Sequence, residues 1–269
     1  MRYAIRTAKN LLLTLIFIYA VTGFFLYYAQ DAVILPGDMQ EFEECTSLPE
    51  SAEPLRYEGE RFFYANNSDD NLVIFYHGNA ESSCGFSDLA GVLEEEGVSY
   101  LLTVYPGFAG DEKNPSVSSM LDYTDIIDDF MSQEGYDRED SMIIGYSIGG
   151  APASYHAREG GFSEVFLVST FNRLSEVARD IYRVYPVGLL LRQDLTNDIW
   201  LEEHDGSVTV AYTENDLTVD RKHTERLISR LQEMGKDPSV LRLDISDHGR
   251  IMREDEVLGR VRESVRGLR

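Results

Sequence analysis

The sequence predicts an α/β fold class with a mostly parallel central sheet, because short apolar runs alternate with longer amphipathic segments. The short runs are rich in β-branched and aromatic residues. Most of them lack strict alternation, as expected for strands buried on both faces of a parallel sheet. We expect strands at residues 73–76, 100–104, 142–144, 165–168, 208–212 and 240–243. The last run is the least regular, and its Arg242 should face solvent.

Amphipathic patterns between these runs predict the helices that cover the sheet. Residues 118–131 place Tyr123, Ile127 and Phe130 on one stripe and leave the aspartates largely off it. Further helices are expected at about 221–234 and 254–266. The chain of 269 residues is long enough for one large domain with a short appendage.

An almost unbroken apolar run spans residues 11–29, and as a helix it would be about 28 Å long, close to the hydrocarbon thickness of a bilayer. Arg2, Arg6 and Lys9 precede the run, whereas seven acidic residues and no basic one follow it before Arg56. This asymmetry favours a cytoplasmic N-terminus and an extracytoplasmic (periplasmic or lumenal) remainder. We therefore expect residues 1–30 to form an uncleaved membrane anchor.

A cleavable signal peptide and a buried core helix are the two alternatives to an anchor. Signal peptides have a shorter apolar core of ~7–15 residues. Cleavage after Gly23 would also leave a strongly apolar mature terminus. A buried core helix should be amphipathic, whereas this segment is apolar all round.

Residues 31–54 are acidic, contain proline and glycine and lack a hydrophobic period, so we expect a juxtamembrane linker. The rest of the chain, residues 55–269, forms the predicted globular domain. Cys45 and Cys84 are the two cysteines. They are either unrelated thiols or a single disulfide, and a disulfide would require an oxidising compartment.

The formal net charge of −23 restricts the partners that the protein can have. Such a surface repels the phosphate backbone of nucleic acids, so we expect no nucleic-acid binding. The same repulsion argues against a domain that lies flat on anionic lipid.

Residues 145–149 match the pattern G-x-S-x-G, with Ser147 at its centre. The predicted strand 142–144 precedes it and an alanine-containing helical segment follows, which is the strand-to-helix context that a nucleophilic serine requires. Side chains at Gly145 and Gly149 would clash across so tight a turn. The alternative interpretation is a glycine-lined turn with an incidental serine.

A serine nucleophile of this type is followed along the chain by an acid and then a histidine. Asp216 follows the strand predicted at 208–212 and is the preferred acid. Glu214 and Asp220 are its rivals, although Asp220 is placed like a helix cap. His248 follows the last predicted strand and every acid candidate, so it is the expected base.

Three other histidines fit the role of base less well. His223 belongs to the helix after Asp216 and is expected at the surface, His156 lies on the helix after Ser147, and His204 lies in an acidic loop.

The segment 76–80 follows the first predicted strand and could complete the site. Backbone N–H groups of Asn79 and Ile148 are candidates for binding the oxygen of a tetrahedral intermediate. His77 stands beside Gly78, which suggests a structural hydrogen-bonding role rather than that of a base.

With residues 75–80, 105–110, 114–116 and 145–150, together with the Asp216 and His248 loops, the chain resembles the α/β-hydrolase superfamily. It is most similar to the Bem46-like branch, in which several members carry an N-terminal membrane anchor. The resemblance covers residue 55 to the C-terminus. It implies a serine hydrolase with a triad of Ser147, Asp216 and His248, an oxyanion loop, no cofactor and no metal. The departures from the family pattern are Ala109, Pro152 and Ala211.

The resemblance also implies a short cap at about residues 171–203, in which residues 185–191 either line an acyl pocket or pack on the domain. A small cap suits acyl esters or thioesters, and hydrolysis of these by the Ser-His-Asp triad is the expected activity. An aminopeptidase- or amidase-like hydrolase on the same triad and a catalytically silent binding protein are the alternatives. Acyl length and oligomeric state stay open.

Overall fold

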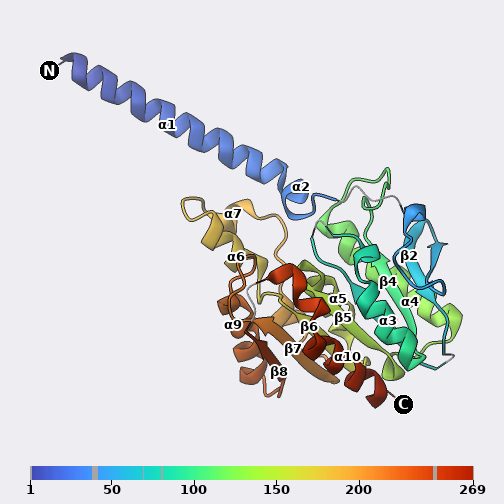
Figure 1. Cartoon of the computed structure of the whole chain (residues 1–269). Coiled ribbons are helices and arrows are strands. Elements are labelled where there is room, and N and C mark those ends of the chain that lie inside the picture. Colours follow the sequence, from blue (N-terminus) through green and yellow to red (C-terminus); the bar gives the residue numbers. More distant parts are fainter. Residues whose placement is uncertain (1, 38–41, 69, 80, 245–246, 269) are drawn as a thin grey trace.

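An eight-stranded sheet forms the centre of the molecule, with the strand order β1-β2-β4-β3-β5-β6-β7-β8 (Figure 1). The strands are β1 (Glu53–Tyr57), β2 (Glu60–Ala65), β3 (Leu72–Tyr76), β4 (Ser99–Val104), β5 (Met142–Tyr146), β6 (Glu164–Val168), β7 (Ser207–Thr213) and β8 (Ser239–Leu243). β2 runs antiparallel to β1 and β4, and all other neighbours are parallel. The mostly parallel sheet predicted from the sequence is confirmed.

The computed structural model describes residues 2–37, 42–68, 70–79, 81–244 and 247–268. Ala80, at the end of the loop motif 75–80, lies outside the described residues. All six expected strands are present as β3 to β8. β1 and β2 were not expected. They contain charged residues and form an antiparallel hairpin at the sheet's edge, where most positions of β1 are exposed and the buried-strand pattern is weak.

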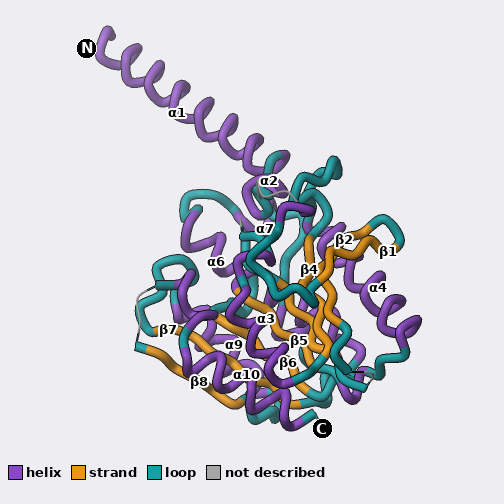
Figure 2. Tube along the Cα trace, turned by 45° about the vertical axis from the view of Figure 1, so that its right-hand side comes forward, coloured by secondary structure: helices purple, strands orange, loops and turns teal. Residues whose placement is uncertain are grey.

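Helices cover both faces of the sheet: α3 (Ser87–Glu96), α4 (Val117–Glu134), α5 (Gly150–His156), α9 (Arg221–Glu233) and α10 (Asp255–Gly267). The chain steps one way from β3 to β4 and the other way from β4 to β8. Right-handed crossovers therefore place α3 on one face and α4, α5 and α9 on the other. α10 packs beside α3 (Figure 2), and α4 packs beside α5.

Every residue of β3, β4, β5 and β6 is buried, as their continuous apolar runs predict. β8 lies at the opposite edge and is mostly exposed. There Arg242 faces solvent, as expected, and pairs with Glu214 at 2.6 Å.

A long helix, α1 (Arg2–Tyr28), projects from the domain (Figure 1). Its segment Tyr3–Tyr28 has a mean hydropathy of 2.0, and only 6% of the apolar window is buried. A buried core helix is thereby excluded. By length and composition α1 could cross a membrane, and a signal sequence would pass the same test.

The expectation of a free linker at 31–54 needs correction, because much of this segment packs on the domain. α2 (Gln30–Ile34) follows α1 directly, and Leu35 and Phe42 are buried in the core. Cys45 forms a disulfide with Cys84. The acidic composition of the segment concealed the few apolar residues that make these contacts.

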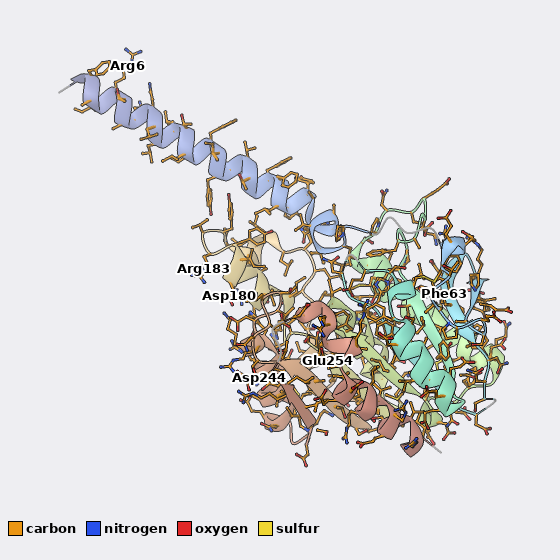
Figure 3. The ribbon with its side chains drawn as sticks, in the orientation of Figure 1. Arg6, Phe63, Asp180, Arg183, Asp244 and Glu254 are labelled. Atoms are coloured by element: carbon orange, nitrogen blue, oxygen red, sulfur yellow. A yellow bond between two sulfur atoms is a disulfide. The ribbon has the colours of Figure 1, made fainter. Side chains whose placement is uncertain are left out.

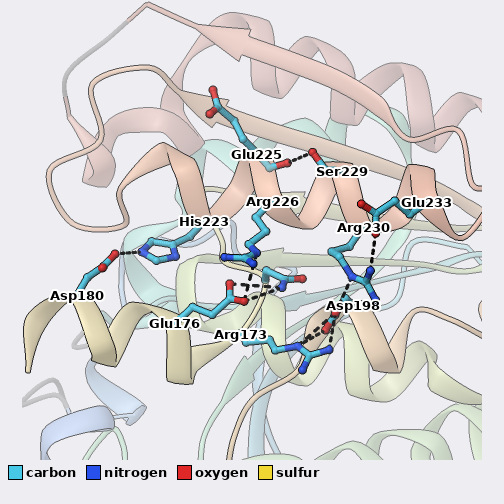
Figure 4. Close-up of polar contacts among 11 residues, drawn as sticks. Arg173, Glu176, Asp180, Asp198, His223, Glu225, Arg226, Ser229, Arg230 and Glu233 are labelled. Carbon is cyan, nitrogen blue, oxygen red and sulfur yellow. Dashed lines mark hydrogen bonds and ion pairs between the residues drawn. The ribbon is translucent and has the colours of Figure 1, made fainter. Parts of the chain in front are cut away.

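The residues between β6 and β7 hold three short helices, α6 (Leu174–Ile181), α7 (Val187–Leu190) and α8 (Asn197–Trp200), in the place expected for a cap. Ion pairs join the base of this segment to α9 (Figure 4). Buried Asp198 pairs with Arg173 at 2.8 Å and with Arg230 at 3.4 Å. Asp180 pairs with His223 at 3.0 Å. These contacts hold the base of the cap on the domain.

Candidate active site

Ser147 lies directly after β5, on a tight turn that leads into α5. Its φ of 55° is one of four positive values among the described non-glycine residues. A side chain there is strained, and the turn directs it to the carboxyl edge of the sheet. Ser147 is only 7% exposed.

The glycines on either side of Ser147 are required by close contacts. A methyl group at Gly149 would lie 2.1 Å from the carbonyl oxygen of Tyr76 and 2.5 Å from that of His77. One at Gly145 would lie 2.6 Å from the Cβ of Ala153. The turn therefore packs directly against the end of β3 and against α5.

The structure brings Asp216, His248 and Ser147 into one hydrogen-bonded series. His248 Nδ1 lies 2.6 Å from Asp216 Oδ2, and His248 Nε2 lies 2.9 Å from Ser147 Oγ. When Nδ1 donates its proton to the carboxylate, Nε2 is left to accept the hydroxyl proton of Ser147. The side chains of Asp216 and His248 are 2% and 11% exposed, so little water competes for these bonds.

Two backbone N–H groups orient the carboxylate of Asp216. Its Oδ1 accepts hydrogen bonds from the N–H groups of Thr218 and Val219, both at 2.8 Å, which leaves Oδ2 for His248. The rival acids have other partners. Glu214 pairs with Arg242, and Asp220 caps α9 by accepting from the N–H of Lys222.

The remaining histidines of the domain lie away from Ser147. His156 is buried between Tyr76 and Asp128, at 2.8 and 2.9 Å. His204 is buried near β7, and burial lowers its pKa. The expectation that His223 lies at the surface is wrong, since it is only 5% exposed. The cap covers it and supplies Asp180 as its partner, which the periodicity of α9 alone cannot indicate.

His77 follows β3 and lies 1% exposed against the ring of Tyr105. Its Nδ1 lies 2.8 Å from the carbonyl oxygen of Gly78. Burial lowers the pKa of His77 to about 4, so the ring is neutral at physiological pH. These contacts fit a residue that shapes the loop after β3.

The buried state of His77 predicts a loss of stability in mild acid. Its folded-state pKa of about 4 lies below the ordinary 6.5, so the unfolded chain binds the proton first as the pH falls. From pH 7 to pH 5 we expect the free energy of unfolding to fall by about 2 kcal/mol from this group. Urea unfolding of the full chain in detergent measures it. A His77→Asn variant should show a shallower pH dependence in this range, and an unchanged slope would contradict the assignment.

The candidate oxyanion residues lie just after two neighbouring parallel strands, β3 and β5. Tyr76 of β3 is in register with Gly145 of β5, and Asn79 and Ile148 each follow three residues later. Their segments therefore meet at the same edge of the sheet, and both residues line the same pocket as Ser147. Asn79 is exposed and Ile148 is buried.

Two residues near His248 were not expected to have a role. Tyr146 donates a hydrogen bond from its hydroxyl to the carbonyl oxygen of His248 at 2.9 Å, and its ring packs on the imidazole. It therefore positions the loop that carries His248. Glu81 is part-buried near Gly78, and burial raises its pKa although His248 and Arg253 lower it. Tyr146 occupies the first x position of the G-x-S-x-G motif, which could have drawn attention to it. Nothing in the sequence singles out Glu81.

A pocket of about 250 Å³ opens at Ser147. Its lining comes from the loops that carry Asn79, Ser147 and Thr218 and from the cap. Unexpectedly, the C-terminal end of α1 and α2 also line it. From the cap come Tyr185, Val187, Leu190 and Leu191, within the segment expected to line a pocket. No charged residue lines it among the described residues. In the part of the chain that the structure describes, no group of three or more His, Cys, Asp or Glu residues could hold a metal ion.

The fold is similar to those of solved esterases and peptidases at low identity. A Pyrococcus furiosus esterase matches 86% of this chain and 98% of its own, with a TM-score of 0.65 and 14% identity. An esterase of Thermogutta terrifontis, solved with butyrate bound, matches 81% and 95%, with a TM-score of 0.61 and 13% identity. A Pyrococcus horikoshii acylaminoacyl peptidase matches 80% of this chain but only 40% of its own length, with a TM-score of 0.61 and 12% identity.

The class defined by these likenesses is the α/β-hydrolase fold, with the sheet order and the strand–serine–helix turn described above. No protein-family model matches the chain.

Proposed function

We propose that this protein is a membrane-anchored serine hydrolase that cleaves acyl esters or thioesters. The observation that carries the proposal is the hydrogen-bonded series Asp216–His248–Ser147 at an apolar pocket. Similarity to esterases supports it through the fold alone.

In the proposed reaction the hydroxyl oxygen of Ser147 attacks the carbonyl carbon while Nε2 of His248 takes the proton. The carboxylate of Asp216 stabilises the resulting imidazolium. The N–H groups of Asn79 and Ile148 bind the tetrahedral oxyanion. His248 then protonates the leaving alcohol or thiol. Water, deprotonated by the same histidine, hydrolyses the acyl-enzyme and restores Ser147.

The pocket favours an acyl group over a peptide N-terminus. An aminopeptidase needs a group that binds a protonated amine, and no carboxylate lines the pocket among the described residues. Apolar side chains from the cap and from α2 suit the hydrocarbon part of an acyl ester.

Three observations support α1 as a retained anchor with the domain outside the cytoplasm. The basic residues precede the apolar run and the acidic ones follow it. The Cys45–Cys84 disulfide suits an oxidising compartment. Tyr19 of α1 stacks on Tyr185 and donates a hydrogen bond to the carbonyl oxygen of Val184, and cleavage after Gly23 would remove both contacts. Membership of the Bem46-like branch, which we also propose, rests on the sequence motifs.

Labelling with two fluorophosphonate probes tests both parts of the proposal. A membrane-permeant probe should modify Ser147 in cells that produce the protein, and peptide mass spectrometry should locate the adduct. A membrane-impermeant probe should label the same serine in spheroplasts without lysis.

Absence of an adduct with the permeant probe would support a catalytically silent binding protein. Labelling by the impermeant probe only after lysis would place the domain in the cytoplasm and leave the hydrolase assignment intact.

A further inference from the structure

The cap is fastened to α1 along one side, which sets where the pocket opens. The rings of Tyr19 and Tyr185 stack at 4.6 Å with an interplanar angle of 4°. Tyr19 also donates a hydrogen bond to the carbonyl oxygen of Val184 at 2.9 Å. Near the start of α2, Gln30 donates to the carbonyl oxygen of Leu190 and accepts from the N–H of Arg192. The cap and the helix therefore form one unit.

The contacts of Tyr19 lie within the apolar part of α1. Tyr19 precedes Tyr28 by about 13 Å of helix rise, and half the hydrocarbon core of a bilayer is about 15 Å thick. With α1 spanning the membrane, the part of the cap beside Tyr19 reaches into the leaflet next to the domain, and helix tilt decreases this depth. We name this part, residues 181–191, the cap apex. Figures 1 and 3 show it on the side toward which α1 projects.

The surface of the cap apex suits such a position. Ile181, Val184 and Leu189 are 65%, 74% and 81% exposed. So many exposed apolar side chains within one short segment are unusual on the surface of a soluble protein. Among the described residues, Arg179 and Arg183 have no carboxylate partner. Exposed apolar residues flanked by arginines are typical of a segment at the headgroup boundary, where the long side chains reach lipid phosphates.

Two neighbouring hollows lie between α1 and the cap, and one of them reaches Ser147. The pocket at Ser147 is walled by Leu26, and by Val33 and Ile34 of α2. A second hollow of about 420 Å³ lies along α1 between Tyr19 and Tyr28. Both are lined by Tyr185 and Leu190.

We propose that the cap apex inserts into the adjoining leaflet and that the pocket takes the acyl chain of a membrane-resident lipid ester laterally from the bilayer. The inference rests on the proposed hydrolase function and adds its substrate class. Entry between α1 and the cap keeps the hydrocarbon chain out of water along its whole path. The carbonyl carbon can then reach Ser147 at the inner end of the pocket.

Two esters with the same leaving group test the substrate route. The full chain is reconstituted in vesicles of phosphatidylcholine and phosphatidylglycerol and given 4-methylumbelliferyl butyrate, which is water-soluble, or the palmitate, which resides in the bilayer. In a Val184→Glu/Leu189→Glu variant we expect palmitate turnover to fall at least about tenfold and butyrate turnover to stay within about twofold. Neither side chain lines the pocket. Val240→Glu, at an exposed apolar position on β8, is the matched control and should leave both rates unchanged.

The outcomes separate this inference from the proposed function. If the wild-type protein hydrolyses neither ester, the hydrolase proposal fails. Two other outcomes would overturn the lateral route. In the first, the wild type hydrolyses the butyrate ester but not the palmitate ester. In the second, the Val184→Glu/Leu189→Glu variant retains full turnover of the palmitate ester.

Insertion itself has a readout that does not depend on activity. The chain contains one tryptophan, Trp200. In vesicles of brominated phosphatidylcholine, the tryptophan fluorescence of a Leu189→Trp variant should be quenched more strongly than that of the wild-type protein. A Val240→Trp variant should show no such increase. Quenching of the Leu189→Trp protein equal to that of the wild type would show that the cap apex stays in water.

Discussion

Replacing Ser147 with alanine is expected to lower kcat for 4-methylumbelliferyl butyrate by about a million-fold, the loss in kcat that removal of the nucleophile causes in a serine protease with a Ser-His-Asp triad. The hydroxyl at Ser147 lies 2.9 Å from Nε2 of His248, so under the proposed mechanism its removal takes away the nucleophile. The fold should be retained, because alanine removes only one oxygen and the strained turn is already accommodated. Steady-state turnover of the purified full chain in detergent measures the loss.

Ser154→Ala provides a matched control for that measurement. Ser154 lies buried on α5, and its hydroxyl donates to the carbonyl oxygen of Gly150 within the helix. Its loss removes a serine hydroxyl close to the site without touching Ser147 or His248. We expect activity close to that of the wild type. A Ser147→Ala protein with activity within tenfold of the wild type would remove Ser147 from the role of nucleophile.

Replacing Gly149 with alanine is expected to disrupt the fold at the site. The added methyl would lie 2.1 Å from the carbonyl oxygen of Tyr76, a backbone atom that cannot rotate away. Relief requires β3 and the turn after Ser147 to move apart. Overpacking in a well-packed core costs about 1–3 kcal/mol, and a clash with two backbone carbonyl oxygens, those of Tyr76 and His77, belongs at or above that upper limit. We expect the free energy of unfolding to fall by at least about 3 kcal/mol, measured by urea unfolding of the full chain in detergent.

Gly91→Ala is the matched control, because Gly91 lies inside α3 and its added methyl would meet no atom within 4 Å. Alanine inside a helix should stabilise the protein by about 0.5–1 kcal/mol relative to glycine. Equal unfolding curves for the two variants would mean that the close approach of Gly149 to β3 does not constrain the turn. The two variants therefore separate the contact at the turn from the general effect of replacing glycine.

Much of the sheet and of the site could be predicted because the signals are local. Strands buried on both faces are continuous apolar runs, so β3 to β7 are visible in the sequence, whereas β8 is a mostly exposed edge strand with a less regular run. Asp216 and His248 could be singled out by their order and by their places after strands, since parallel strands bring their carboxyl ends to one edge. The distances between these side chains were not predictable, because they depend on loops such as the one that Tyr146 positions.

Other features escaped prediction because they depend on contacts between distant segments. β1 and β2 form an edge hairpin in which most of β1 is exposed and β2 is buried at only three of its six positions, so the two strands lack a continuous apolar run. His223 is polar and lies on an amphipathic helix, yet the cap buries it with Asp180. Residues 31–54 have the composition of a linker, yet the packing of Leu35 and Phe42 and the Cys45–Cys84 disulfide attach them to the domain.

The sequence by itself determined the fold class, the serine turn and the apolar N-terminal segment, because each depends on the order and period of neighbouring residues. Only the tertiary structure decided that Asp216 and His248 meet Ser147 at hydrogen-bonding distance, and that α1 and α2 form one wall of the pocket. Both outcomes depend on how residues far apart in the chain pack together, and local hydrophobic periodicity carries no information about such contacts.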